Sequence, residues 1–249
     1  MTLQPEFATV QTNGIGLRVA LAGKGPLVVL VHGWPESWYS WRHQIPALAE
    51  AGYRVAAPDV RGYGGSDKPA AIEAYAIKEM CADIAGLVEA LGERQAILVG
   101  HDWGAPIVWH TSLFFPQRVR AVAALSVPHA GRGPAPRIEL FRNIYKDRFF
   151  YQLYFQQPGV AEAEFESDVR ASLRKIYYAA SGEGRKGHPD RPSRPTRNTS
   201  TVWWTRIRCR IGSRPTTSNI TPGNSQGMAF VDRSTVTARP SSTSPSRRR

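Results

Sequence analysis

The first part of the chain alternates short apolar runs with longer amphipathic ones. Two short runs of β-prone residues, 7–11 and 17–22, flank the turn sequence Thr12-Asn13-Gly14. Asn and Gly tolerate the left-handed backbone conformation that a tight hairpin turn requires. The chain is therefore predicted to open with a β-hairpin.

Four apolar runs after the hairpin predict strands, and the first of them has the continuous apolar pattern of a strand that is covered on both faces of a sheet. These runs are 26–31, 53–57, 96–99 and 119–127. Segments with helical spacing of apolar residues separate them, namely 37–51 (where Pro46 is expected to break or kink the helix), 75–91 and 105–115. The alternation of strand and helix predicts an α/β fold with a mostly parallel sheet and crossover helices.

The pattern changes after Pro128. Residues 131–136 form a linker rich in Gly and Pro, residues 138–155 are rich in aromatic side chains, and residues 161–180 form a charged amphipathic segment. Each of the last two segments is predicted to form a helix that lies over the sheet. We therefore expect an α/β core at 1–130 and a partial helical lid at 131–185.

The last segment, 186–249, has a different composition from the rest of the chain. It contains no Leu, and it carries 13 Lys and Arg against 2 Asp and Glu, whereas residues 1–185 carry 19 against 18. Such a composition predicts a disordered tail. The tail could bind nucleic acid or acidic lipid non-specifically. The interpretation we favour is a shifted reading frame in a GC-rich gene, which replaces Leu by Arg, Ser, Thr and Pro.

Composition excludes several classes of protein for the first 185 residues. Their nearly balanced charge is not that of a nucleic-acid-binding domain. The two cysteines, Cys81 and Cys209, do not make a disulfide framework, so a reducing compartment is expected. The sequence shows neither a signal peptide nor a run of membrane-spanning length, and we expect a soluble cytoplasmic protein without membrane contact.

The strongest chemical motif is Gly100-His101-Asp102-Trp103-Gly104, which follows an apolar strand and precedes a helical run. A strand, a sharp turn and a helix form the geometry of a nucleophile elbow, here with an acid at its apex. Gly is needed on both sides, because a Cβ there would press against the strand and the helix. The alternative is an ordinary turn in which Asp102 caps the helix.

Four motifs in order resemble the epoxide hydrolases of the α/β-hydrolase fold. They are HGWPESWYSWR at 32–42, RGYGGSDKP at 61–69, GHDWGA at 100–105 and YQLYFQQPGVAEAE at 151–164. The resemblance covers roughly residues 1–185. It implies hydrolysis of an epoxide to a vicinal diol, a reaction that detoxifies epoxides and needs no cofactor or metal, with a small apolar epoxide as the substrate.

The resemblance also implies roles for individual residues. Asp102 is the nucleophile that forms an ester with the epoxide carbon. Tyr151 donates a proton to the epoxide oxygen, with Tyr154, one helical turn away, as the fallback and aromatic packing as the alternative role. The backbone N–H groups of Trp103 and Trp34 form the oxyanion hole. His32 is expected to hold its loop by a hydrogen bond rather than to act in catalysis.

The sequence departs from the family after the lid. Hydrolysis of the ester needs a histidine base and an acid partner, which in this fold follow the lid, yet the histidines after Asp102 are His110, His129 and His188. The second lid tyrosine has no match, and the last strands of the sheet are missing. The sequence therefore predicts a chain truncated or frameshifted after about residue 185, with an uncovered sheet edge and impaired ester hydrolysis.

Three other functions remain open. A haloalkane dehalogenase also uses an Asp nucleophile and a neighbouring Trp such as Trp103, although this chain has Trp34 where a second halide-binding residue is usual. A non-catalytic ligand-binding protein would fit the missing base. A basic interaction protein would act through residues 186–249.

Overall fold

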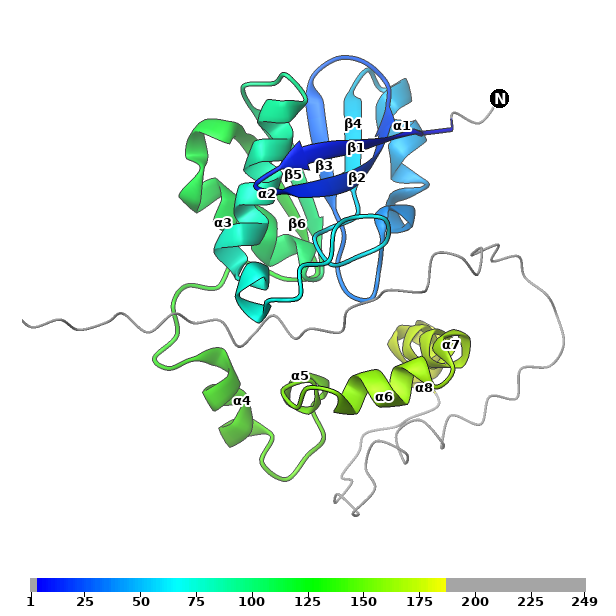
Figure 1. The fold of residues 1–249 in the computed structure, drawn as a ribbon, viewed down its shortest axis with the longest axis vertical. Helices are drawn as coiled ribbons and strands as arrows, with labels where there is room; N and C mark the ends of the chain where they lie inside the picture. Colours follow the sequence, from blue (N-terminus) through cyan, green and yellow to red (C-terminus); the bar gives the residue numbers. More distant parts are fainter. Residues whose placement is uncertain (1–3, 187–249) are drawn as a thin grey trace, which may run out of the picture.

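The computed structural model describes residues 4–186, and Figure 1 shows their arrangement. A six-stranded sheet forms the core, in the order β1-β2-β4-β3-β5-β6. The strands are β1 (Glu6–Thr12), β2 (Ile15–Ala22), β3 (Leu27–Val31), β4 (Arg54–Pro58), β5 (Ala96–His101) and β6 (Val119–Leu125). The α/β class predicted from the alternating runs is confirmed.

The sheet is antiparallel at one end and parallel through the rest. Strands β1 and β2 form the predicted hairpin, whose turn places Asn13 and Gly14 at φ values of 44° and 74°. Strand β2 also pairs antiparallel with β4, whereas β3 pairs parallel with both β4 and β5, and β5 pairs parallel with β6. The parallel part places the ends of β3 and β5 side by side.

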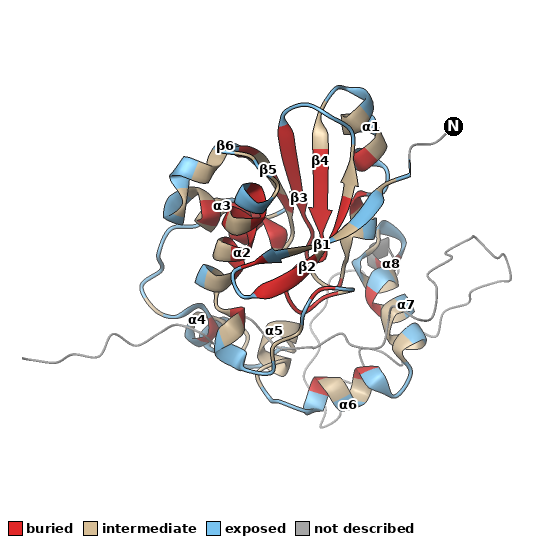
Figure 2. Cartoon of the chain, turned by 45° about the horizontal axis from the view of Figure 1, so that its top comes forward, coloured by how far each residue is buried: buried red, intermediate tan, exposed pale blue. Residues whose placement is uncertain are grey.

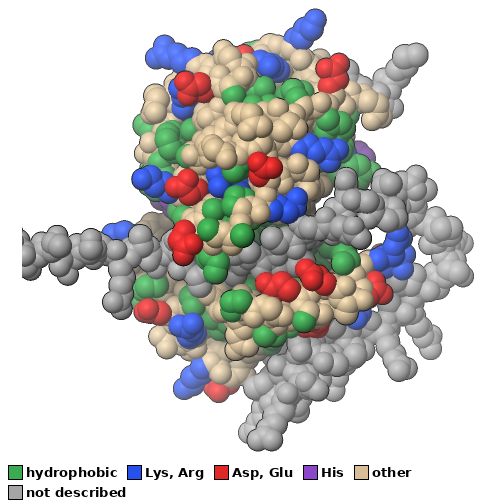
Figure 3. Space-filling view, viewed as in Figure 1, with side chains coloured by type: hydrophobic (Ala, Val, Ile, Leu, Met, Phe, Trp, Pro, Cys, Tyr) green, Lys and Arg blue, Asp and Glu red, His purple; other side chains and the backbone are tan. Residues whose placement is uncertain are grey.

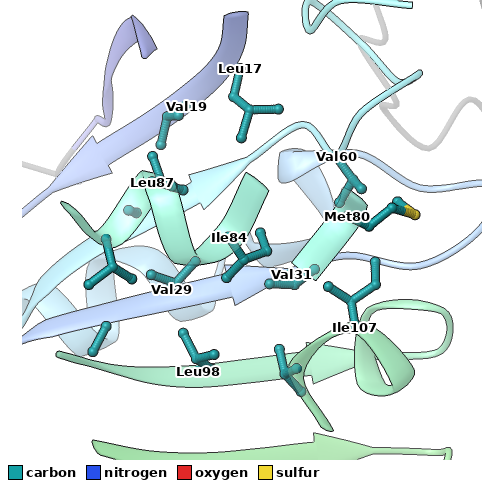
Figure 4. Close-up of a cluster of buried hydrophobic side chains, with 14 of the residues drawn as sticks. Leu17, Val19, Val29, Val31, Val60, Met80, Ile84, Leu87, Leu98 and Ile107 are labelled. Carbon is teal, nitrogen blue, oxygen red and sulfur yellow. The ribbon is translucent and has the colours of Figure 1, made fainter. Parts of the chain in front are cut away.

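Helices cover both faces of the sheet (Figure 1). The helices of this part are α1 (Gln44–Glu50), α2 (Ile77–Ala90) and α3 (Gly104–Phe114), with short 3-10 helices η1 (Trp38–Trp41), η2 (Ile72–Tyr75) and η3 (Pro116–Arg118). Alternate residues of β3 belong to two buried clusters, with Val29 and Val31 under α2 and α3, and Val28 and Leu30 on the side of α1. Figure 4 shows the first cluster, and Figure 2 shows how completely the central strands are buried.

Strand β6 is the exposed edge of the sheet. Within residues 4–186 it pairs with β5 alone. Ala121, Ala123 and Leu125, whose partners on β5 lie on the α1 side, are exposed. The prediction of an uncovered sheet edge is thus confirmed for the described part of the chain, where this face carries no helix over β6.

The helices after β6 are shorter than the sequence predicted. They are α4 (Arg137–Ile144), α5 (Tyr151–Tyr154), α6 (Val160–Glu166), α7 (Val169–Ala180) and α8 (Gly182–Lys186). The prediction of one helix over 161–180 is wrong, because Asp168 has an extended backbone and its side chain accepts a hydrogen bond from the N–H of Ala171. That cap starts a new helix. The single helix predicted over 138–155 is likewise two helices.

Two further details differ from the expectation. Pro46 does not break a helix, because α1 begins only at Gln44 and a proline in the first turn has no intrahelical acceptor to lose. Helix α8 was not predicted, and the Ser181 hydroxyl supports it by accepting a hydrogen bond from the N–H of Gly184. The predicted disordered tail, the frameshift and His188 all concern residues beyond 186, outside the described part.

The described residues show neither a membrane-spanning helix nor, on the face seen in Figure 3, a concentrated basic patch. None of its helices is long and apolar enough to cross a membrane. On the face seen in Figure 3, acidic and basic side chains are interspersed over the described residues rather than gathered into one basic patch. This distribution matches the near-balanced charge of residues 1–185.

Similar substitutions on the central strand β5 and on the edge strand β6 should lower the free energy of unfolding by different amounts. Leu98 on β5 is fully buried, whereas Leu125 at the end of β6 is 43% exposed. Leu98→Ala should lower the free energy of unfolding by about 2–5 kcal/mol, and Leu125→Ala by less than about 1 kcal/mol. Thermal or urea denaturation of the two variants measures this difference. Equal losses would mean that the β6 face is covered in solution.

Candidate active site

Asp102 lies at the apex of the bend between β5 and α3. Its φ is +51°, in the left-handed region that few residues other than Gly adopt. Its N–H donates to the carbonyl of Leu125 at 3.3 Å, and its carbonyl accepts from the N–H of Ala105 at 3.1 Å. The surrounding backbone therefore holds a strained conformation in place, as is common at functional sites.

The glycines on either side allow this bend. A Cβ at Gly104 would come within 2.0 Å of the carbonyl oxygen of Val31, and one at Gly100 within 2.3 Å of the carbonyl oxygen of Gly104. Both contacts are with backbone, which cannot move aside as a flexible side chain would. The steric reason that the sequence predicted for these two glycines is confirmed.

The carboxylate of Asp102 is bound by the loop that follows β3. The N–H of Trp34 donates to Asp102 Oδ1 at 2.9 Å. Gly33 lies directly against the Asp102 side chain, since a Cβ there would be 2.4 Å from the Asp102 Cβ. The cap position of α3 is Trp103, and no side chain caps it. The alternative in which Asp102 caps the helix is therefore wrong.

Trp103, whose N–H is the other expected member of the oxyanion hole, directly follows Asp102 in the sequence. Within residues 4–186 this N–H makes no hydrogen bond. The two N–H groups expected in the oxyanion hole thus differ, because that of Trp34 already holds Asp102 Oδ1 whereas that of Trp103 has no acceptor among the described residues.

His32 fixes the loop that carries Gly33 and Trp34. The ring is buried, its Nε2 lies 2.9 Å from the N–H of Val60, and its Nδ1 lies 2.8 Å from the carbonyl oxygen of Gly33. Because Nε2 must accept the proton of Val60, Nδ1 carries the hydrogen and donates to Gly33. The prediction that His32 holds its loop by a hydrogen bond is confirmed.

Tyr151 reaches the same loop from α5. Its ring stacks on that of Trp34, with centroids 5.8 Å apart and planes at 17°, and the Phe155 ring meets Trp34 edge-on at 5.3 Å. Gln152 Nε2 donates to the Tyr151 hydroxyl at 3.0 Å. The structure therefore brings Tyr151 against the residue whose N–H holds Asp102.

Tyr154 is engaged elsewhere. Its hydroxyl donates to Glu164 Oε2 at 2.5 Å, which joins α5 to α6. Burial and the Glu164 carboxylate raise the pKa of Tyr154 above its usual value. The Tyr154 hydroxyl is therefore committed to Glu164 rather than free to donate to a substrate.

The two described histidines that follow Asp102 along the chain are occupied away from it. His110 Nδ1 lies 2.7 Å from the carbonyl oxygen of Pro106 within α3. The His129 ring packs edge-on against Trp109 at 5.7 Å. In residues 4–186, no group of three or more His, Cys, Asp or Glu side chains could hold a metal ion.

The sequence analysis missed two polar residues near the elbow, namely His101, which precedes Asp102, and Glu36, which contacts His101. Glu36 Oε2 accepts the N–H of Gly33 at 3.0 Å and lies 3.3 Å from His101 Nδ1. Above this pair, the hydroxyl of Tyr177 on α7 donates to the carbonyl of Pro35 at 3.0 Å. Burial, then the charge of Glu36, raises the pKa of Tyr177 to about 12. Glu36 lies within the motif at 32–42 and His101 within the motif at 100–105, so their place in these motifs could have identified them as candidate site residues.

Comparison with protein-family models decides the family. The model for the alpha/beta hydrolase fold matches residues 26–182, from the residue before β3 to the first residue of α8. The chain belongs to the α/β-hydrolase fold family. Within that family, it is a homologue of epoxide hydrolases.

Relatives of this hydrolase homologue include epoxide hydrolase A of Mycobacterium tuberculosis, 53% identical over 174 residues, or 69% of this chain and 54% of the relative. The bifunctional epoxide hydrolase 2 of Sus scrofa is 47% identical over 67% of this chain and 30% of its own length. The crystal structure of epoxide hydrolase A from Mycobacterium thermoresistibile matches with a TM-score of 0.70 and 44% identity, over 81% of this chain and 69% of that one. The chain thus spans about half the length of the curated relatives, or less.

The glycine of the elbow gives a test of the bend in this hydrolase homologue. Gly104→Ala should lower the free energy of unfolding by about 1–3 kcal/mol or more, because its Cβ would overlap the backbone of β3. Gly131→Ala is the matched control, since a Cβ there meets nothing within 4 Å. Denaturation midpoints measure both. A neutral Gly104→Ala would contradict the close approach of β3 and α3.

Proposed function

We propose that this chain opens small apolar epoxides through an ester at Asp102, as an epoxide hydrolase does. The observation that carries the proposal is the carboxylate held at a strained apex by the N–H of Trp34. The epoxide hydrolase relatives, one of them 53% identical over 174 residues, support the choice of substrate class. In this proposal residues 1–130 are the catalytic core and 131–185 are the lid.

The first step forms the ester. Because Trp34 holds Oδ1, the lone pair of Oδ2 attacks an epoxide carbon, and the strained carbon–oxygen bond breaks. The electron pair goes to the epoxide oxygen, which takes a proton from the hydroxyl of Tyr151. The aromatic rings of Trp34, Tyr151 and Phe155 pack against one another at this place and favour an apolar substrate. The step needs no cofactor, because ring strain supplies the driving force.

The second step is hydrolysis of the ester by water. The tetrahedral intermediate carries its negative charge on Oδ1, where the N–H groups of Trp34 and Trp103 form the oxyanion hole. We propose that this step is slow in this chain. His110 and His129 are engaged with Pro106 and Trp109, and no other described histidine lies beyond the elbow. A cytoplasmic setting, the absence of membrane contact and a role in detoxification remain predictions.

Intact-mass spectrometry of the full chain with styrene oxide tests the nucleophile. The chain should gain the mass of one epoxide, with a burst of one event per chain followed by slow product release. Asp102→Asn should form no adduct, because an amide is a far weaker nucleophile than a carboxylate. Immediate sustained turnover without a burst would contradict slow hydrolysis. Halide release from a haloalkane would favour a dehalogenase instead.

A matched pair of variants tests the proton donor. Tyr151→Phe should slow formation of the adduct by about 100-fold or more, as expected for loss of a positioned acid. Tyr154→Phe should change it little, since the Tyr154 hydroxyl is bonded to Glu164. Single-turnover kinetics measure both rates. The opposite ranking would assign the donor to Tyr154.

A further inference from the structure

We propose that His101, oriented by Glu36, is the general base that hydrolyses the ester at Asp102 in this chain. The inference rests on the proposed function, since it concerns the second step of that reaction. Among the described histidines, His101 is the one that a carboxylate orients, and in this proposal it catalyses the slow decay of the ester.

The geometry comes from three neighbouring contacts. Consecutive N–H groups of one loop hold two carboxylates, with Gly33 donating to Glu36 Oε2 at 3.0 Å and Trp34 donating to Asp102 Oδ1 at 2.9 Å. Glu36 Oε2 also lies 3.3 Å from His101 Nδ1. His101 is the last residue of β5 and directly precedes Asp102. Residues 33 and 34 of the loop after β3 thus bind both the nucleophile and the carboxylate that orients the His101 ring.

The free nitrogen of His101 is suited to accept a proton. When Nδ1–H donates to Glu36, Nε2 carries a lone pair. In the described part of the chain Nε2 makes no hydrogen bond, and 36% of the side chain is exposed, so water can reach it. Glu36 is only 16% exposed, so its carboxylate stabilises the imidazolium that forms.

Other described histidines do not offer this arrangement. Both ring nitrogens of His32 are engaged, with Val60 and Gly33. Nδ1 of His110 is bonded to a carbonyl within its own helix, and no carboxylate orients the ring. Among the ion-pair contacts of residues 4–186, His101 with Glu36 is the one that involves a histidine.

In the proposed step, water attacks the ester carbonyl with His101 as the base. The oxygen of water forms a bond to the Asp102 carbonyl carbon while His101 Nε2 takes one of its protons, and the π electrons move to Oδ1. The tetrahedral intermediate then collapses, and its bond to the alcohol oxygen breaks. That oxygen takes the proton back from Nε2, which releases the diol and leaves Asp102 as a carboxylic acid. The acid proton returns to the Tyr151 phenolate left by the first step, which restores both the Asp102 carboxylate and the Tyr151 hydroxyl.

The test follows formation and decay of the styrene oxide adduct on the full chain, by intact mass in water labelled with oxygen-18. Attack at the Asp102 carbon should leave one label in that carboxylate after a single turnover. His101→Gln should slow decay by about 100-fold, and more than it slows formation. Glu36→Gln should slow decay less, because it leaves the base in place. His43→Gln, at an exposed histidine ahead of α1, is the control and should decay like the original chain.

Chemical rescue separates a base from a structural residue. Added imidazole should restore decay in His101→Ala and should have little effect on the original chain, since a purely structural loss would not be rescued by a free base. Decay of His101→Gln at the original rate, or no rescue of a slowed His101→Ala adduct, would overturn the inference while leaving Asp102 as the nucleophile. Absence of both adduct and diol in the original chain would overturn the proposed function and this inference together.

Discussion

The hydrogen bond from the N–H of Trp34 to Asp102 Oδ1 is the contact on which the candidate site depends. It joins two loops 68 residues apart in sequence, which meet because β3 and β5 are parallel neighbours in the sheet. A carboxylate at a bend with φ of +51° would otherwise be free to rotate into solvent. The bond fixes one oxygen and leaves the other to react.

The same loop also connects the sheet to the helices that follow β6. The Trp34 ring stacks on Tyr151, and the carbonyl of Pro35 accepts the hydroxyl of Tyr177. Below it, His32 bonds the loop to Val60. Residues 32–36 therefore contact the nucleophile, the candidate proton donor and the candidate base, so that the three groups share one frame.

The sheet is unevenly covered around this frame. Its centre is fully buried, whereas β6 exposes Ala121, Ala123 and Leu125 on the α1 side. His101 lies opposite Leu125 in the register of β5 and β6. The uncovered edge leaves apolar surface exposed, which is unfavourable for stability. It also leaves His101 partly accessible to water, so that a hydrolytic water can reach the ring. The exposed residues of β6, which make this edge of the sheet less stable, therefore lie next to His101, the proposed base for slow ester hydrolysis.

Local sequence determined much of the outcome. The turn residues Thr12-Asn13-Gly14 indicated the hairpin strands. Four apolar runs indicated the other strands, because apolar side chains are stable where a sheet and its helices bury them. Gly100 and Gly104 marked the bend, since a strand, a Gly-flanked turn and a helical run form a local pattern, although the backbone that excludes a Cβ at Gly104 belongs to Val31 on β3. Local reading also had limits. It missed the break at Asp168, where one cap bond outweighed a continuing helical pattern.

Only the tertiary structure decided which polar groups meet. Glu36 and His101 are 65 residues apart, and Tyr177 and Pro35 are 142 residues apart. The hydrophobic periodicity of the sequence cannot predict such pairs. They form because parallel strands and the helices above them bring separate loops to one end of the sheet. The sequence determined the bend and its acid. The fold decided that Trp34 holds that acid, that Tyr151 stacks on Trp34, and that Glu36 of the same loop pairs with His101.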